Sequence, residues 1–282
     1  MSGLHTYVTE HLDDQTKQAS TYFCTAISTS RLLPNDLAVQ VQGRIPDPIL
    51  RYWEHELTFP VLPPDPEAAF QRVAHLYLQC GRCHLGNRRM RVALHRGSLQ
   101  SPVAFLGEGP GKTENRNGVV FSGPAGRLQN TLIQGVGINP AHINWLNLVG
   151  CRPCDGRHFP DRPPNTVEKI ACSERLLLML RAIRPSVVVC LGKQACDLFW
   201  DEPPHPWTWH QLPHGLIVGH ARHPSYLLRR VAVRGGEAER IAAVRFYTAL
   251  KERMPYLRKL PAWPVPIRYL GEILERGVMV GK

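Results

Sequence analysis

The sequence lacks long hydrophobic runs and the marks of an exported protein. No apolar run approaches the ~18 residues that a membrane-spanning helix needs. The first residues, MSGLHTYVTEHLDDQTKQ, also lack the basic start and apolar block of a secretory signal. We therefore expect a soluble, cytoplasmic chain without a membrane partner, and we expect it to be a monomer.

Acidic residues are few for a chain of this size. Only 23 Asp and Glu residues stand against 34 Lys and Arg, which leaves a net charge of +11 with the histidines neutral. Basic side chains that meet phosphates release condensed counterions, so this excess favours a polyanionic partner. Many proteins of similar charge bind no polyanion, and the charge alone therefore identifies no partner.

Eight cysteines are present, and two of them form the pair Cys80-x-x-Cys83. In a chain without an export signal a disulfide framework is not expected, and such a pair is more typical of a metal or redox site. Cys190 lies in an apolar run and Cys196 in the segment that follows it, so both are predicted to be buried thiols.

Short apolar runs alternate with helical patterns through most of the chain. The predicted strands are 103–106, 143–149, 186–191 and 216–218. The predicted helices begin after the N-cap residues Asp65 and Asn165, near Ala125, and near Glu237. This order predicts an α/β fold, a three-layer α/β/α sandwich around a central four-stranded parallel sheet. The working site of such a sheet lies at the carboxyl ends of its strands.

One glycine-rich stretch, FLGEGPGKTENRNGVVFSG, begins as the first strand ends and looks like a phosphate loop. That motif requires a glycine five residues before Gly111, where this chain has Leu106. The motif also opens directly into a helix, whereas residues 114–118 here predict a polar turn. Spacing and context therefore both argue against a nucleotide site.

The same stretch resembles a different family. Together, GEGPGKTENRNGVVFSGPAGRL (107–128), NLVGCRP (147–153) and RHPSYLLRR (222–230) are similar, in order and spacing, to the motifs of family 4 uracil-DNA glycosylases. The resemblance covers roughly residues 66–254. It implies a glycosylase domain at 65–254, between an N-terminal extension (1–64) of unknown role and a proline-containing tail (255–282).

This resemblance implies a monofunctional DNA glycosylase of base-excision repair. Its substrate is uracil in single- or double-stranded DNA, and its products are free uracil and an abasic site. Phe121 would stack on the flipped base, the Asn147 amide would bond O4 and N3–H, and His223 would donate a hydrogen bond to O2. Taken alone, the three residues also fit core packing, a loop cap and a turn histidine.

Glu108 is the candidate that orients or deprotonates the attacking water, because Gly109 stands where a better-known branch has an aspartate. Glycines without side chains let the backbone approach the sugar and phosphate closely. The residues expected to do so are Gly107, Gly109 and Gly111. The residues expected to contact DNA are Leu227, with Leu228 beside it, and Arg229 and Arg230; core leucines and solvated arginines are the alternative.

The resemblance also assigns Cys80, Cys83, Cys151 and Cys172 as ligands of a 4Fe–4S cluster. Four cysteines could equally hold a structural zinc, and Cys154 could compete as a ligand. The expected role is architectural: the cluster would join the segment before the sheet to the loop of residues 151–172.

Several features depart from the family pattern and leave other functions open. Val120, Ser122 and Gly150 replace more usual residues, and the 151–172 loop is unusually long and carries His158. One alternative is a relative that traps the sugar covalently through this loop. Others are a uracil-DNA binding protein without turnover and an iron–sulfur electron carrier.

Overall fold

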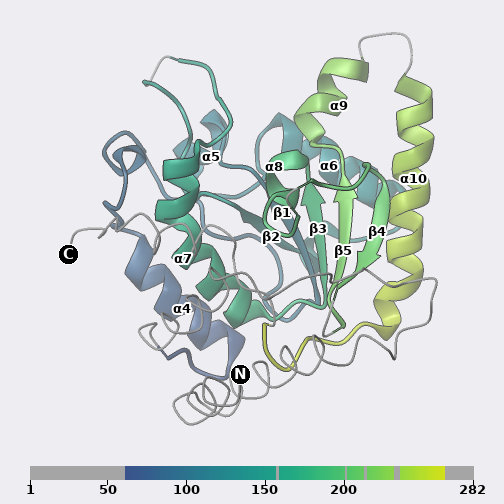
Figure 1. The fold of residues 1–282 in the computed structure, drawn as a ribbon, viewed down its shortest axis with the longest axis horizontal. Helices are drawn as coiled ribbons and strands as arrows, with labels where there is room; N and C mark the ends of the chain where they lie inside the picture. Colours follow the sequence, from purple (N-terminus) through teal and green to yellow (C-terminus); the bar gives the residue numbers. More distant parts are fainter. Residues whose placement is uncertain (1–60, 157–158, 201, 213–214, 232–235, 264–282) are drawn as a thin grey trace.

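The computed structural model describes residues 61–263, apart from residues 157–158, 201, 213–214 and 232–235 (Figure 1). Most of the expected N-terminal extension (1–64) and of the expected tail (255–282) lies outside the described residues, as does His158. Among the described residues, no helix combines the length and apolar character that crossing a membrane requires.

Five strands form one sheet in the order β2-β1-β3-β5-β4. The first four of these strands are parallel, as expected, and β4 pairs antiparallel with β5. The strands are β1 (Val103–Gly107), β2 (Asn144–Asn147), β3 (Val187–Leu191), β4 (Thr208–Gln211) and β5 (Ile217–Ala221).

The predicted α/β sandwich is confirmed, with β4 as an additional strand. The sequence of β4, TWHQ, is short and carries no apolar run, because an edge strand is only partly covered by other elements. Its burial pattern of three half-exposed residues and one exposed residue agrees with that position. The hydrophobic pattern that predicts buried parallel strands therefore gives no signal here.

Helices cover both faces of the sheet (Figure 1). One face packs against α4 (Pro66–Tyr77) and α7 (Thr166–Ile183), and the other packs against α6 (Pro124–Gly135) and α10 (Gly236–Arg253). Side chains of β1 alternate between the two cores: Ala104 and Leu106 face α7, whereas Val103 and Phe105 face α10. This alternation is the ordinary pleat of a strand, so each strand contributes to both hydrophobic layers.

The predicted helix starts are confirmed by their caps. Asp65 accepts a hydrogen bond from the Ala68 N–H at 2.8 Å. Asn165 and Glu168 form a capping box, in which each side chain accepts from the other residue's backbone N–H. The helix α7 ends at Ile183, followed by Arg184 with φ of 53° before Pro185.

The prediction of a polar turn after Gly111 is wrong. Lys112–Asn117 form the short helix α5, which ends at Gly118 with φ of 75°. The sequence shows no apolar periodicity in this segment, so the pattern gave no sign of a helix. The helix is stabilised at its start by a single carboxylate instead. Glu114 accepts hydrogen bonds from the backbone N–H groups of Gly111 (3.1 Å) and Gly123 (2.8 Å). A phosphate loop is still excluded, by its spacing and by this buried carboxylate in the position that a phosphate would need.

The shorter helical segments include the 3-10 segments η1 (His84–Asn87) and η2 (Pro140–His142), α8 (Lys193–Cys196) after β3, and α9 (Pro224–Val231) after β5. The 3-10 turn η4 (Met254–Tyr256) follows α10. The first part of the tail then packs on the domain. Lys259 Nζ donates to the Leu99 carbonyl at 2.9 Å, and Trp263 is only 6% exposed.

Candidate active site

A cavity of about 840 Å³ opens at the carboxyl ends of the parallel strands. Its wall includes Glu108 after β1, Asn147 at the end of β2, Phe121 from the segment between α5 and α6, and His223 after β5. In Figure 1 the carboxyl ends of β3 and β5 lie at the edge of the sheet next to α8 and α9, the helices that follow these two strands. The structure therefore brings together four predicted site residues that are far apart in the sequence.

Gly107 is the point at which the ring and the amide meet. A Cβ added there would lie 2.4 Å from Phe121 Cζ and 2.6 Å from Asn147 Oδ1, closer than side chains tolerate. Gly107 does not line the cavity; it makes room for the two side chains that do. Gly109 and Gly111 line the cavity directly, as the sequence predicts for residues that approach a substrate.

Phe121 is held in an unusual conformation. Its φ of 54° lies in the left-handed region, which costs about 1–3 kcal/mol and persists only where the surroundings enforce it. The surroundings here include Gly126 of α6, where a Cβ would lie 1.8 Å from the Phe121 carbonyl oxygen. The ring packs on Trp145 at 5.2 Å between centroids. Phe121 thus belongs to the core and the cavity wall at once.

His223 presents a neutral imidazole with a known tautomer. The Ser225 backbone N–H donates to His223 Nδ1 at 3.2 Å, and Ser225 Oγ lies 2.7 Å from the same nitrogen. A backbone N–H can only donate, so Nδ1 is the acceptor and Nε2 carries the proton. Burial and the charge of Arg229 lower the pKa of His223 to about 4. The side chain is therefore a hydrogen-bond donor through Nε2 at neutral pH.

Glu108 is half-buried next to His223. Burial raises the pKa of Glu108, and the charges of Lys169 and Arg229 partly oppose this. Both residues border Gly192, which has φ of 91° and where a Cβ would lie 3.0 Å from His223 Cβ and 3.2 Å from Glu108 Oε1. Sequence reasoning missed Gly192, although its place directly after β3 follows the same strand-end rule that identified Glu108.

Lys169 was also missed by sequence reasoning. It is buried in the first turn of α7, and its Nζ donates to Gln194 Oε1 at 2.9 Å. Only the tertiary contact of α7 with α8 brings its charge near Glu108, so no local pattern indicated it.

The residues expected to contact DNA differ in how far their side chains are exposed. Arg229 is exposed and lines the cavity. Leu228 is 40% exposed, whereas Leu227 is 7% exposed, so Leu228 is the one of the two that presents much of its side chain at the surface. The side chain of Arg230 lies outside the described residues.

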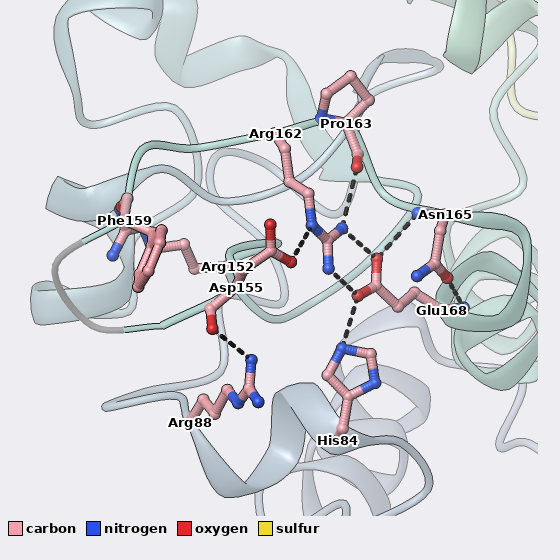
Figure 2. A network of polar contacts seen from close by, with 9 residues as sticks. All are labelled: His84, Arg88, Arg152, Asp155, Phe159, Arg162, Pro163, Asn165 and Glu168. Carbon is pink, nitrogen blue, oxygen red and sulfur yellow. Dashed lines mark hydrogen bonds and ion pairs between the residues drawn. The ribbon is translucent and has the colours of Figure 1, made fainter.

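The long loop forms another part of the cavity wall, through Pro153, Asp161, Arg162 and Pro163. Figure 2 shows the Arg162 guanidinium between two carboxylates, at 2.8 Å from Asp155 Oδ1 and 2.7 Å from Glu168 Oε1. Glu168 is fully buried and also pairs with His84 Nε2 at 2.9 Å. Burial alone would raise the pKa of Glu168, but its bonds to Arg162 and the Asn165 N–H lower it.

The four predicted cluster ligands lie close enough together to affect one another's charge. Burial raises the pKa of Cys151 to about 12, and the neighbouring Cys172 and Cys83 add to this rise. Cys172 Sγ accepts from the Gly150 N–H at 3.4 Å and from Arg175 Nε at 3.3 Å. No three His, Cys, Asp or Glu side chains within the described part of the chain are arranged to hold a single metal ion. Cys190 and Cys196 are fully buried, which confirms that prediction.

Comparison with known proteins extends these observations. The family model of the uracil DNA glycosylase superfamily matches residues 94–244. A type-4 uracil-DNA glycosylase of Thermotoga maritima is 33% identical over 183 residues, which is 62% of this chain and 90% of that protein. The type-4 enzyme of Archaeoglobus fulgidus is 32% identical over 124 residues (44% and 60%). That of Saccharolobus solfataricus is 27% identical over 168 residues (55% and 76%).

Proposed function

Since the chain belongs to the uracil-DNA glycosylase superfamily, and within it to the type-4 enzymes, we propose that its cavity binds a uracil flipped out of DNA and holds it for hydrolysis. The chain is a DNA glycosylase, a hydrolase that acts in DNA repair. The observation that supports the proposal most is that Phe121, Asn147 and His223 line one cavity.

Base recognition is assigned to Phe121 and Asn147. The flipped base stacks on the Phe121 ring, and the Asn147 amide offers a donor to O4 and an acceptor to N3–H of uracil. Cytosine presents the reverse pattern at these two positions, so a fixed amide leaves unpaired buried groups if cytosine enters. Because Gly107 packs against both side chains, neither can turn away to suit the wrong base.

Bond cleavage is assigned to His223 and Glu108. The C1′–N1 bond breaks and its electron pair leaves with the uracil, whose negative charge gathers at O2. The Nε2–H of neutral His223 donates to O2 and stabilises this charge more in the transition state than in the bound substrate. No proton needs to move from the imidazole, since its pKa of about 4 keeps it neutral and its N–H bonded.

The sugar cation that remains is attacked by water. Glu108 as a carboxylate opposes the positive charge on the sugar, orients the water and accepts its proton when the C1′–O bond forms. The products are free uracil and an abasic site in DNA. Arg229 and Leu228 are proposed to hold the flanking DNA, through a phosphate contact and by filling the gap left in the stack.

Cys80, Cys83, Cys151 and Cys172 are proposed to hold a 4Fe–4S cluster. The donor set fits: four thiols, with N–H donors directed at Cys172 Sγ and hydrogen bonds from the Leu85 and Gly86 backbone to Cys83. When bound, the cluster supplies a structural crosslink between the segment before β1 and α7.

The experiment is to incubate anaerobically purified protein with oligonucleotides that contain a single uracil or cytosine, and then to cleave abasic sites with alkali. We expect cleavage at uracil alone, and loss of that cleavage in His223→Ala. Binding of uracil-DNA without alkali-labile sites would instead identify a non-catalytic binder. Iron content and visible absorbance of the same preparation test the cluster.

A further inference from the structure

Arg175 is a buried cation that lies between the cysteines and the uracil-reading residue. It follows Cys172 by one helical turn in α7, so both side chains point to the same side of that helix. Its side chain is among the most buried of the described residues, with 1% exposed. The proposed chemistry does not use it, and in the proposed cluster site it is only a donor to Cys172 Sγ.

The guanidinium makes contacts in two directions. Nη2 donates to the carbonyl oxygens of Asn147 at 2.6 Å and Leu148 at 2.9 Å. Nε donates to Cys172 Sγ at 3.3 Å. The remaining nitrogen, Nη1, is buried without a hydrogen-bond partner among the described residues.

The position of β2 explains why Asn147 needs such a contact. β2 is the outermost strand on its side of the described sheet, and the isolated bridge between Trp145 and Arg96 holds its middle but does not reach its end. Asn147 is the last residue of β2, and the carbonyl oxygens of Asn147 and Leu148 both accept hydrogen bonds from Arg175. Arg175 supplies the hydrogen bonds that a neighbouring strand would otherwise provide.

The charge of Arg175 also needs a partner. A buried guanidinium is costly unless an anion compensates it, and its hydrogen bonds to the described residues go to two carbonyls and one sulfur. A thiolate at Cys172, held in an anionic cluster, supplies that compensation. The guanidinium and the cluster therefore stabilise each other.

We propose that Arg175 is a positioning residue that ties the main chain of Asn147 to the cluster ligand Cys172. This inference rests on the proposed function. The cluster fixes Cys172, which orients the guanidinium through its contact with Nε, and the guanidinium in turn fixes the backbone from which the Asn147 amide reads uracil. Through this contact the cluster supports base recognition without touching the substrate.

The first test is a double-mutant cycle on the excision rate. Arg175→Met, Asn147→Ala and the double variant are measured in single turnover on uracil-DNA. We expect Arg175→Met alone to slow excision by about tenfold or more, and to slow it by less than about threefold when Asn147 is already alanine. A general structural defect predicts the same factor in both backgrounds, and that result would overturn the proposal.

The second test reads the cluster directly. Hydrogen bonds and charge near the sulfurs set cluster potentials, so removing the cation in Arg175→Met should move the midpoint potential to more negative values. Arg175→Lys keeps the charge without the planar fork; we expect it to hold the potential near that of the parent and still to lose excision rate. An unchanged potential in Arg175→Met, or a parent protein without iron, overturns the link to the cluster.

Two variants on the same helix serve as controls. Arg181→Met removes a half-buried arginine of α7, and Leu180→Ala destabilises the core side of α7. Neither should move the potential or show coupling to Asn147→Ala. If Arg175→Met does not fold, Arg175→Gln, which also removes the charge, replaces it in both measurements. If the parent chain leaves uracil in DNA, the proposed function fails; if it removes uracil but the cycle is additive, only the role of Arg175 fails.

Discussion

Phe121 and Asn147 in one part of the cavity wall are fixed by close packing, whereas Asp161 and Arg162 of the long loop, in another part, are held by ion pairs. The first part has no spare volume: a single methyl group at Gly107 would overlap both the ring and the amide. The second depends on Arg162 and Arg152, each of which binds a carboxylate of the loop, Asp155 or Asp161. The positions of Phe121 and Asn147 therefore depend on close packing, and the positions of the loop residues depend on charge.

The largest expected effect is loss of the hydrogen-bond donor of His223. His223→Ala should reduce the single-turnover excision rate by about 100- to 1,000-fold, because removal of one donor to a developing oxyanion has that effect in other enzymes. The matched control is Ser225→Ala, which keeps the backbone N–H that sets the tautomer. We expect this control to remain within about tenfold of the parent. Equal losses in the two variants would contradict the assignment of His223.

Gly107→Ala tests whether shape alone sustains the pocket. The added methyl displaces the Phe121 ring and the Asn147 amide, and misplacement by about 1 Å costs roughly 100-fold in rate. Excision rate and thermal unfolding are measured together. Gly135→Ala is the control, since a Cβ there meets nothing within 4 Å. A Gly107→Ala enzyme of normal rate would refute the packed-wall description.

Arg162→Met tests the charged side. Glu168 is fully buried, and leaving a buried carboxylate without its main partner should lower the free energy of unfolding by about 3 kcal/mol in urea titrations. The excision rate should fall less than in the two variants above. Adding Glu168→Gln should recover part of the stability, because no uncompensated charge then remains. If Glu168→Gln does not restore any of the free energy of unfolding, the Arg162–Glu168 pair stabilises the protein through its packing and not through its charges.

The smallest effect is a shift in the pH profile. Glu108 acts as a carboxylate, and burial raises its pKa above the ordinary value of 4.5, so activity should fall as pH drops through this raised value. His223, with a pKa of about 4, stays neutral over that range. Lys169→Met removes a charge that lowers the Glu108 pKa and should move the acid limb to higher pH, whereas Lys251→Met on the exposed side of α10 should not. If the activity of the parent, Lys169→Met and Lys251→Met falls at the same acidic pH, the ionisation of Glu108 does not control the excision rate.

Much of the fold could be predicted from the sequence, because strands and helix starts follow local rules. Apolar runs located four of the five strands, cap residues located helix starts, and the strand-end rule pointed to Glu108. Asn147, Phe121 and His223 were predicted from the resemblance to the family. The errors have physical causes too. α5 is stabilised by one carboxylate rather than by apolar periodicity, and β4 is too short and polar to give a strand pattern.

The contacts that hold the site could not be predicted in this way. Arg175 meets Asn147 only because α7 lies beside the edge of the sheet, and Lys169 approaches Glu108 only across α8. Leu227 and Leu228 are adjacent and chemically identical, so only the orientation of α9 decides which of them faces solvent. These are properties of the tertiary arrangement, which a single sequence does not display.

Gly192 has a practical consequence for inhibitor design. Because bare main chain separates the imidazole from the carboxylate, the two groups lie within the span of one nucleoside. A compound that joins a uracil ring to a protonated amine in place of the sugar carbon would engage both of them at once. Enlarging position 192 would force them apart and should abolish tight inhibition by such a compound.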